Sequence, residues 1–533
     1  MAYSWKFKAD QFSKTSPTYV AYCRAFSLLD KIRELKAEKK SSLEGPEKLL
    51  GVMSTLTEGC IRKITKLDNE LSLNRVNLMQ RKNIENTIRT ILLSVNILHA
   101  FLRYIDATRL SRNPTGMIKP WELLIRKYGG ELNIIIRPQW KYNYSYYNMV
   151  TILKKINDII RDQETELELQ EIGLYFPILS FAGLERDNVL LHIILAHEIG
   201  HLIDEIRKIS SLEKHGDKII ETLNTPPVSD KLNRLYDLSV NIMKTLKTKL
   251  QETPGVTYEL FIEHEAKSEA QTELVNKIIT WLEEITADII AVRIIGPSFI
   301  FALYQTQLAQ VSKMGPAGDY PPPQIRIENC IEYWNTLDKE DKFFDPKTTD
   351  TDGCQSIKEC VRKYLDDIKQ KETETLPEPS VIDKLQKERY NLLTEILVDV
   401  VKNPISSIKE SIARCIEPFK LDDGVFRLIE LLKDRITPVR SEGKKVDSST
   451  RPECDIASIL NASWIFWLTH ERDIAPGEEG TKTEEVASLD KLRISYYEPL
   501  VEISHLILKG IELADFDKQF SDLKQRHKST RNS

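Results

Sequence analysis

The sequence lacks the signatures that assign many chains to a class at first reading. It has no G-x-x-x-x-G-K-[ST], no G-x-G-x-x-G and no G-x-S-x-G, so nothing supports a P-loop, a dinucleotide-binding fold or an α/β-hydrolase. Its first residues have no apolar core of a signal peptide, and no run reaches about 18 apolar residues. We therefore expect a cytoplasmic protein without a membrane span.

The cysteines do not indicate a disulfide framework or a zinc knuckle. The seven cysteines are scattered, odd in number and never spaced as C-x-x-C. A disulfide-stapled domain or a zinc knuckle would need paired spacings. We interpret these cysteines as free thiols in a reducing compartment.

Charge is distributed unevenly. The net charge is -5, yet residues 1–127 carry an excess of roughly ten positive charges. No interleaved aromatic pattern accompanies them, which favours solvated helices packing on an acidic neighbour over a face for nucleic acid. An acidic partner or a nucleic-acid-responsive function stays open as the alternative.

Periodicity predicts an organisation dominated by helices. Residues 18–110 have apolar positions at helical spacing, and the chain is again helical from about 355 to the end. Two β-rich stretches, 131–147 and 173–183, are expected to be strands, with a helix between them at about 148–168. With 533 residues, the chain is too long for one core.

We predict three domains from these changes in charge and residue pattern along the chain. A basic helical domain covers 1–127, a second domain covers 128–345, and a helical C-terminal domain covers 346–533. The second domain is expected to contain a helical insertion at about 208–270. Such flanking helical domains could select a substrate or a protein partner.

One short motif carries chemistry. His197-Glu198-Ile199-Gly200-His201 is an H-E-x-x-H, and residues four apart on a helix project from the same face, so the two histidines can bind one ion. Glu198 can then hold and deprotonate the water that a zinc ion activates. Two ligands do not complete a zinc site.

The third ligand is expected downstream. A metzincin is excluded because Asp204 and Arg207 occupy the places of its glycine and third histidine. Glu284 and Asp288 are four apart within an apolar-periodic helix. This E-x-x-x-D is the gluzincin arrangement, in which the Glu completes the protein ligands and the Asp accepts the outer N–H of a ligating histidine. Glu283 is the alternative ligand if the helix phase differs.

HEIGH followed by EITADIIAVRIIGP resembles the ImmA/IrrE-type peptidases and the HtpX and CAAX prenyl endopeptidase family. Both have a helix E-x-x-A-[DN]-x-x-A after the H-E-x-x-H helix. The segment Tyr320-Pro321-Pro322-Pro323-Gln324-Ile325-Arg326 is similar to the second family's H-P-P-x-x-x-R, with Tyr320 in place of histidine. The resemblance covers about 170–335 and implies that Tyr320 or Arg326 lies near the oxyanion.

The resemblance also implies an edge strand that holds substrate by backbone pairing, for which residues 178–182 are the candidate. The expected fold is mainly α with a small β-sheet: a zincin-like α+β catalytic core flanked by helical domains. The expected function is that of a Zn²⁺-dependent endopeptidase acting on a protein or peptide. The alternative is a helical regulatory or interaction protein with a structural or vestigial zinc site.

Overall fold

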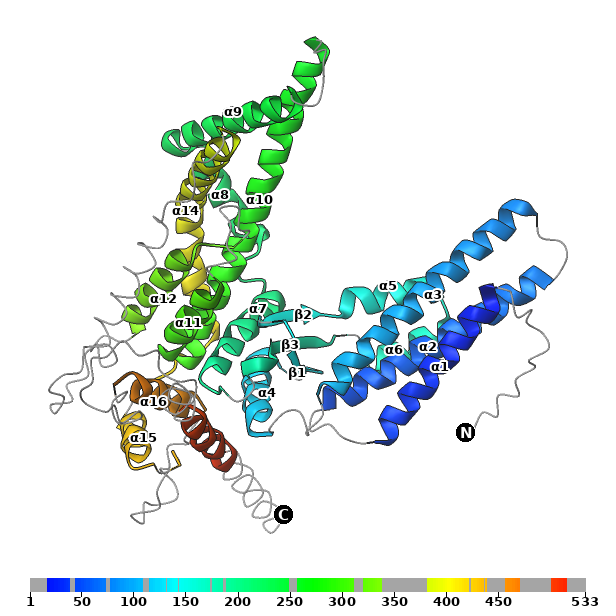
Figure 1. Ribbon diagram of the computed structural model, residues 1–533, viewed down its shortest axis with the longest axis horizontal. Helices are drawn as coiled ribbons and strands as arrows, with labels where there is room; N and C mark the ends of the chain where they lie inside the picture. Colours follow the sequence, from blue (N-terminus) through cyan, green and yellow to red (C-terminus); the bar gives the residue numbers. More distant parts are fainter. Residues whose placement is uncertain are drawn as a thin grey trace, which may run out of the picture. The chain divides into compact units, whose positions relative to one another are not determined.

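The computed structural model (Figure 1) describes fifteen stretches of the chain. All structural statements concern these residues: 17–38, 44–72, 77–108, 115–130, 132–141, 143–172, 175–185, 188–248, 256–310, 320–337, 381–420, 423–435, 437–438, 456–469 and 500–514. The expectation for the fold class is confirmed at the coarse level, because the described chain is mainly helical with one small sheet.

The chain divides into two compact units, Met1–Arg186 and Asp187–Ser533. The boundary predicted after residue 127 does not coincide with this division, and the one predicted after residue 345 lies outside the described residues. The physical reason is that the strands share a core with the preceding helices. Ile135 and Ile178 from the sheet belong to the same buried cluster as helical residues such as Leu56 and Leu98.

Unit 1 combines a helical layer with the sheet. Its elements are α1 (Pro17–Ala37), α2 (Glu44–Ser72), α3 (Leu78–Asp106), α4 (Thr115–Gly129), β1 (Ile135–Gln139), β2 (Ser145–Asn148), α5 (Val150–Ile160), α6 (Gln163–Ile172), β3 (Pro177–Ala182) and a 3₁₀ turn, η2 (Gly183–Glu185). The stretch predicted as one strand at 131–147 is two strands, and the predicted helix between the strands is also two.

Local sequence explains where the helices of unit 1 begin and end. Asn77 and Gln80 form a capping box at the start of α3, each side chain accepting from the other's backbone N–H. Arg161, with φ of 46°, ends α5. Asp162 then caps α6, because its carboxylate accepts from the backbone N–H of Thr165 at 3.3 Å.

By length and composition α3 is the one described helix that could cross a membrane, a test that core helices also pass. Ile84, Ile88, Ile91 and Val95 recur at helical spacing on its buried face. They belong to the core cluster of unit 1.

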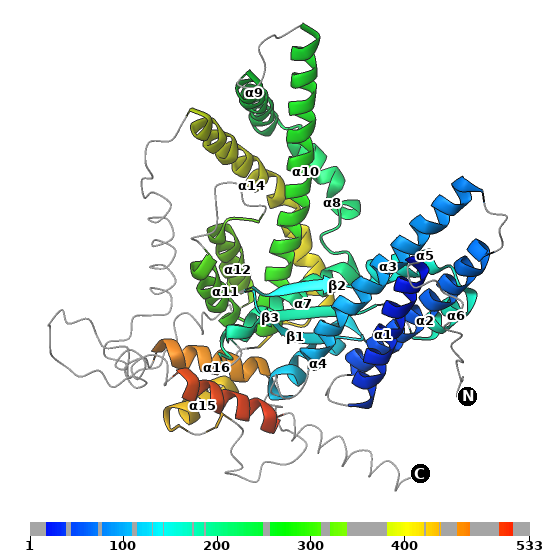
Figure 2. The ribbon, with the colours of Figure 1, turned by 45° about the vertical axis from the view of Figure 1, so that its right-hand side comes forward.

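The sheet has the order β1-β3-β2, with β3 parallel to β1 and antiparallel to β2; Figure 2 shows β3 in the middle. Both edges of β3 are therefore used for pairing within the sheet. Residues 178–182 lie in this central strand, where they pair with β1 along their whole length and with β2 as far as Ser180. The expectation that they form an edge strand was therefore wrong. The outer strand β2 pairs Tyr146 with Leu179 on its inner side.

Unit 2 is helical throughout its described part. Its elements are η3 (Leu191–Ile194), α7 (Leu195–Arg207), α8 (Leu212–Leu223), α9 (Pro226–Thr248), α10 (Val256–Ile295), α11 (Ser298–Gln310), α12 (Pro323–Leu337), α14 (Val381–Cys415), α15 (Asp423–Lys433), α16 (Ile456–Thr469) and a further helix at 500–514. Helices α8 and α9 occupy most of the insertion expected at about 208–270.

The 40-residue helix α10 is the centre of unit 2. It packs on α7, α9, α12 and α14, and Figure 1 shows α9 beside its N-terminal half. Hydrogen bonds from Arg389 to Glu273 and from Arg293 to Ala413 place α14 along the later part of α10. At its other end Gly296, with φ of +94°, turns the chain into α11. The four described cysteines, Cys23, Cys60, Cys330 and Cys415, are free; Cys354, Cys360 and Cys454 lie outside the described residues.

Candidate metal centre

Helix α7 presents the H-E-x-x-H motif from a buried position. Its preceding turn, η3, is fully buried and continues into α7 without a break. Of the motif's polar side chains, His197 and Glu198 are buried and His201 is partly buried. Helix α7 ends at Lys208, which has φ of 50° and whose N–H bonds to Asp204.

Helix α10 crosses α7 at very short range because the motif contains a glycine. A Cβ built on Gly200 would stand 2.6 Å from the carbonyl oxygen of Ala287 and 2.7 Å from its Cα. Real side chains do not tolerate such contacts. The small residues at 200 and 287 therefore let the two helix backbones approach, and this approach brings Glu284 to the histidines.

Three potential ligands converge where the helices cross. The Nε2 atoms of His197 and His201 lie 3.0 Å apart. The carboxylate of Glu284 is 3.3 Å from each of these nitrogens, through Oε2 and Oε1 respectively. Each residue offers one ligand atom, and these atoms all lie within 4.8 Å of one another. This group could hold a metal ion, and it contains Glu284, whereas Glu283 is exposed.

Asp288 orients the first histidine. Its Oδ1 lies 2.8 Å from Nδ1 of His197, and the carboxylate is completely buried. In the neutral imidazole, which is the form that binds a metal, an Nδ1–H that donates to Asp288 leaves the lone pair of Nε2 facing Glu284 and His201. The expected bond between Asp288 and a histidine of the motif is thus present in the structure.

Arg326 reaches the same cluster from α12. Its Nε and Nη2 donate to Oδ2 and Oδ1 of Asp288, both at 2.8 Å, and its Nη1 lies 3.1 Å from Oε2 of Glu284. This is a bidentate, buried clamp on a carboxylate. The guanidinium group therefore contacts two acidic side chains of the centre through its N–H groups.

Tyr320 differs from these residues in burial. It is 56% exposed, whereas Arg326 is 6% exposed. Residues 311–319, just before Tyr320, lie outside the described part of the chain.

The charges of the cluster shift one another's pKa values. Burial alone would lower the pKa of His197, but Asp288 and Glu284 raise it to about 10. Burial opposes ionisation of Glu284, yet Arg326 and His197 hold its pKa well below the usual range. Burial raises the pKa of Glu198. Among the described residues Glu198 makes no hydrogen bond or ion pair, so its carboxyl is uncommitted.

One contact of the centre was missed by sequence reasoning. Phe299, from α11, is completely buried, and its ring stacks on His197 with centroids 6.4 Å apart and planes 7° apart. The segment SFIFALY is uniformly apolar. Nothing in its periodicity distinguishes Phe299 from its neighbours, so no sequence signal could have selected it.

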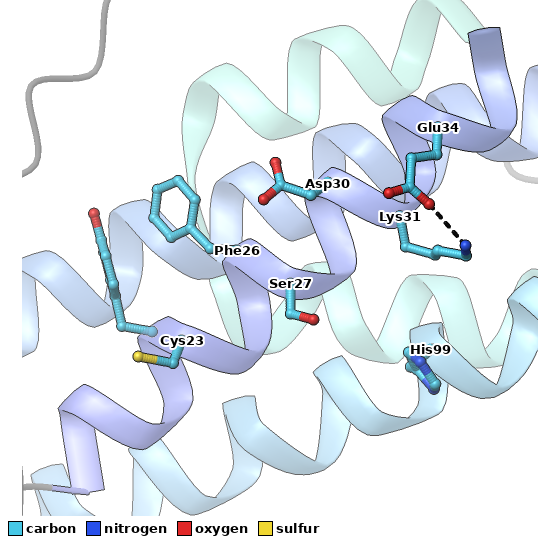
Figure 3. A pocket seen from close by; sticks show the side chains of 8 residues that line it. Cys23, Phe26, Ser27, Asp30, Lys31, Glu34 and His99 are labelled. Carbon is cyan, nitrogen blue, oxygen red and sulfur yellow. Dashed lines mark hydrogen bonds and ion pairs between the residues drawn. The ribbon is translucent and has the colours of Figure 1, made fainter.

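A surface groove lies elsewhere, in unit 1. It has a volume of about 570 Å³ and is shallow. Figure 3 shows it along one face of α1, beside His99 of α3. Aromatic and charged side chains line it, and two of these, Lys31 and Glu34, form an ion pair of 2.7 Å. None of the metal-centre residues contributes to this groove.

Comparison with known proteins adds no relative. No protein-family model, no curated protein and no solved structure matches the chain. The resemblance to gluzincin peptidases rests on the motifs around His197, Glu284 and Arg326.

Proposed function

We propose that the protein is a zinc-dependent endopeptidase with a gluzincin-type centre. The observation that carries the proposal is that the ligand atoms of His197, His201 and Glu284 all lie within 4.8 Å of one another. Glu198, whose carboxyl is uncommitted, lies on α7 between the two histidines. Two imidazoles and one carboxylate, with room for a substrate position, are the donor set of catalytic zinc sites. The bond from His197 to Asp288 is the supporting contact that such sites use.

When bound, zinc supplies Lewis acidity, which lowers the pKa of water and polarises a carbonyl group. The chain supplies the proton transfers. Glu198 takes a proton from the attacking water as the water adds to the scissile carbonyl, and it delivers that proton to the leaving amine nitrogen. Burial raises the pKa of Glu198, which suits a group that must first accept and then release a proton.

The other residues hold this arrangement. Asp288 keeps the Nδ1–H tautomer of His197. Arg326 contributes by fixing Asp288 and Glu284, and we assign the oxyanion to neither Arg326 nor Tyr320. We further propose that the substrate is a protein or peptide, that the protein is cytoplasmic, and that α7 with the C-terminal half of α10 forms the helical half of a zincin-like core.

The rival function is regulatory, with a structural or vestigial zinc. A structural site closes its coordination with a fourth protein ligand, and the described group offers three. The two functions differ in what Glu198 must do, because only a peptidase needs a general base.

The test uses metal content and turnover together. We expect about one zinc per wild-type chain and its loss in His201→Ala. Glu198→Gln is expected to keep the zinc and the fold but to lose turnover. The substrate is found by comparing the peptides generated in cells that express wild-type protein or Glu198→Gln. Zinc retained at wild-type level in His201→Ala, or cleavage retained in Glu198→Gln, would contradict the proposal.

A further inference from the structure

Helix α16 lies far along the chain from the metal motif but is buried against the same structural elements. Asn461, Ser463 and Trp464 are at most 1% exposed. Buried polar side chains require hydrogen-bond partners, and the partners of Asn461 and Trp464 show what this helix supports.

Asn461 binds the turn that joins α10 to α11. Its Oδ1 accepts from the N–H of Ser298 at 3.1 Å, and its Nδ2 donates to the carbonyl of Ile295 as well as to Ala457 at 2.8 Å. One amide side chain therefore holds the backbone on both sides of Gly296. The positive φ of Gly296 makes this turn conformation specific to glycine.

The turn sets the position of Phe299. This residue follows Ser298 directly, and its N–H bonds to the carbonyl of Gly296 at 3.3 Å. Its ring then stacks on His197. A displacement of the turn would therefore move the aromatic surface against which the imidazole rests.

Trp464 bonds to the backbone that precedes the helix carrying the two histidines. Its indole Nε1 donates to the carbonyl of Leu190 at 3.2 Å, and its ring stacks on Phe301 of α11 with centroids 5.9 Å apart. Leu190 immediately precedes η3, which runs directly into α7. Helix α16 thus holds the backbone that leads into α7 and also packs on α11, whose Phe299 stacks on His197.

We propose that α16 positions the metal centre and that Asn461 and Trp464 are positioning residues for His197. Neither residue touches the three ligands; they act through the α10–α11 turn, Phe299 and the backbone before α7. The part of this inference that concerns metal binding rests on the proposed function. The C-terminal region thereby becomes part of the catalytic unit, in addition to any role in recognising a partner.

The experiment compares two tryptophans of α16. Trp464→Phe removes the indole N–H that bonds to Leu190 but keeps an aromatic ring for Phe301. Trp467→Phe is the matched control, because Trp467 is only half-buried and makes no hydrogen bond or ring contact among the described residues. Asn461→Ala is the second test variant.

Backbone hydrogen exchange of residues 195–207 is measured first, in the full-length metal-free protein. We expect exchange in Trp464→Phe to be roughly fivefold faster than in Trp467→Phe, the equivalent of one lost neutral hydrogen bond. Asn461→Ala should likewise make backbone hydrogen exchange faster, at residues 296–300. Equal exchange in Trp464→Phe and Trp467→Phe would overturn the inference, even if Asn461→Ala does not fold.

Metal binding is measured second, by the visible spectrum of the Co²⁺-substituted protein and by the rate of zinc loss to a chelator. Trp464→Phe should change the spectrum and release zinc roughly fivefold faster than Trp467→Phe. An unchanged spectrum and release rate would overturn the positioning of His197. A wild-type protein that binds neither metal would instead overturn the proposed function, while the exchange data would still decide whether α16 holds α7.

Discussion

Among the single residues of the candidate metal centre, buried charged side chains stabilise one another through direct contacts. Five ionisable side chains, those of His197, Glu198, Glu284, Asp288 and Arg326, are buried together. Burying an unpaired charge is costly. Arg326 balances Asp288 and Glu284, and Asp288 balances His197, so the removal of one member leaves another uncompensated.

We expect Asp288→Asn to weaken zinc binding by about 10- to 100-fold, because the amide no longer accepts from Nδ1–H of His197 as a charged group. Zinc affinity measured by competition with a chromophoric chelator tests this. Glu283→Gln is the control, since Glu283 is an exposed neighbour on the same helix. An unchanged affinity in Asp288→Asn, or an equal loss in Glu283→Gln, would contradict the assigned contacts.

At the scale of elements, the approach of two helices is what assembles the centre. Helix α7 carries two of the candidate ligands and α10 carries the third, and the helices meet at Gly200 and Ala287. The E-x-x-x-D and H-E-x-x-H motifs predict which faces of the helices are functional. The glycine between the two histidines determines how closely those faces meet.

We therefore expect Gly200→Ala to destabilise unit 2 by about 1–3 kcal/mol through overpacking, and to weaken zinc binding as α10 is pushed away. Gly216→Ala is the control: Gly216 lies within α8, and a Cβ there meets nothing within 4 Å. That change should be neutral or stabilise by about 0.5–1 kcal/mol. Denaturant unfolding and zinc affinity are measured for both, and equal behaviour of the two variants would rule out the steric explanation.

The junction of α2 with α6 gives a prediction on pH. Asp162 caps α6 and forms an ion pair of 2.8 Å with Arg62. Burial acts to raise the pKa of Asp162, but hydrogen bonds to Thr165 and Arg62 hold it below 3.8. A lowered pKa in the folded state contributes stability above the unfolded value, and that stability is lost as pH falls through the folded value.

Asp162→Asn should accordingly cost unit 1 about 1 kcal/mol near neutral pH. The difference between wild type and variant should shrink as pH falls below about 4, because the wild-type carboxyl then becomes neutral as well. Urea unfolding of both proteins at a series of pH values measures this difference in the free energy of unfolding. A difference that stays constant with pH would show that the charge of Asp162 makes no contribution.

Within the whole molecule, all three candidate ligands belong to one of the two compact units. His197, His201 and Glu284 lie in Asp187–Ser533, and the sheet lies in Met1–Arg186. A ligand that binds only the folded form of one unit stabilises that unit, by about 2.7 kcal/mol when its concentration is 100 times the dissociation constant.

Zinc added to the metal-free protein should therefore slow hydrogen exchange in α7 and in residues 281–295, and leave α1–α3 unchanged. Exchange mapped by mass spectrometry, with and without zinc, measures this. Magnesium is the control, because a site with two histidines disfavours it. Equal protection of both units by zinc would contradict a site confined to unit 2.

Local spacing along the chain was enough to predict the main elements and the faces on which the candidate site residues lie. Helical periodicity identified most of the helices, and the four-residue spacings placed His197 with His201 and Glu284 with Asp288 on shared faces. These patterns depend on backbone geometry within one element, which is why they predicted the group of side chains that the structure assembles and that could hold a metal ion.

The contacts between elements became known from the tertiary structure. It divided the stretch 131–147 into two strands, placed residues 178–182 in the centre of the sheet, and put Phe299 on His197. It paired Arg326 with Asp288 and Glu284 and left Tyr320 more than half exposed. Strand order and contacts between helices depend on packing between distant segments, and the spacing of residues along one chain segment carries no record of them.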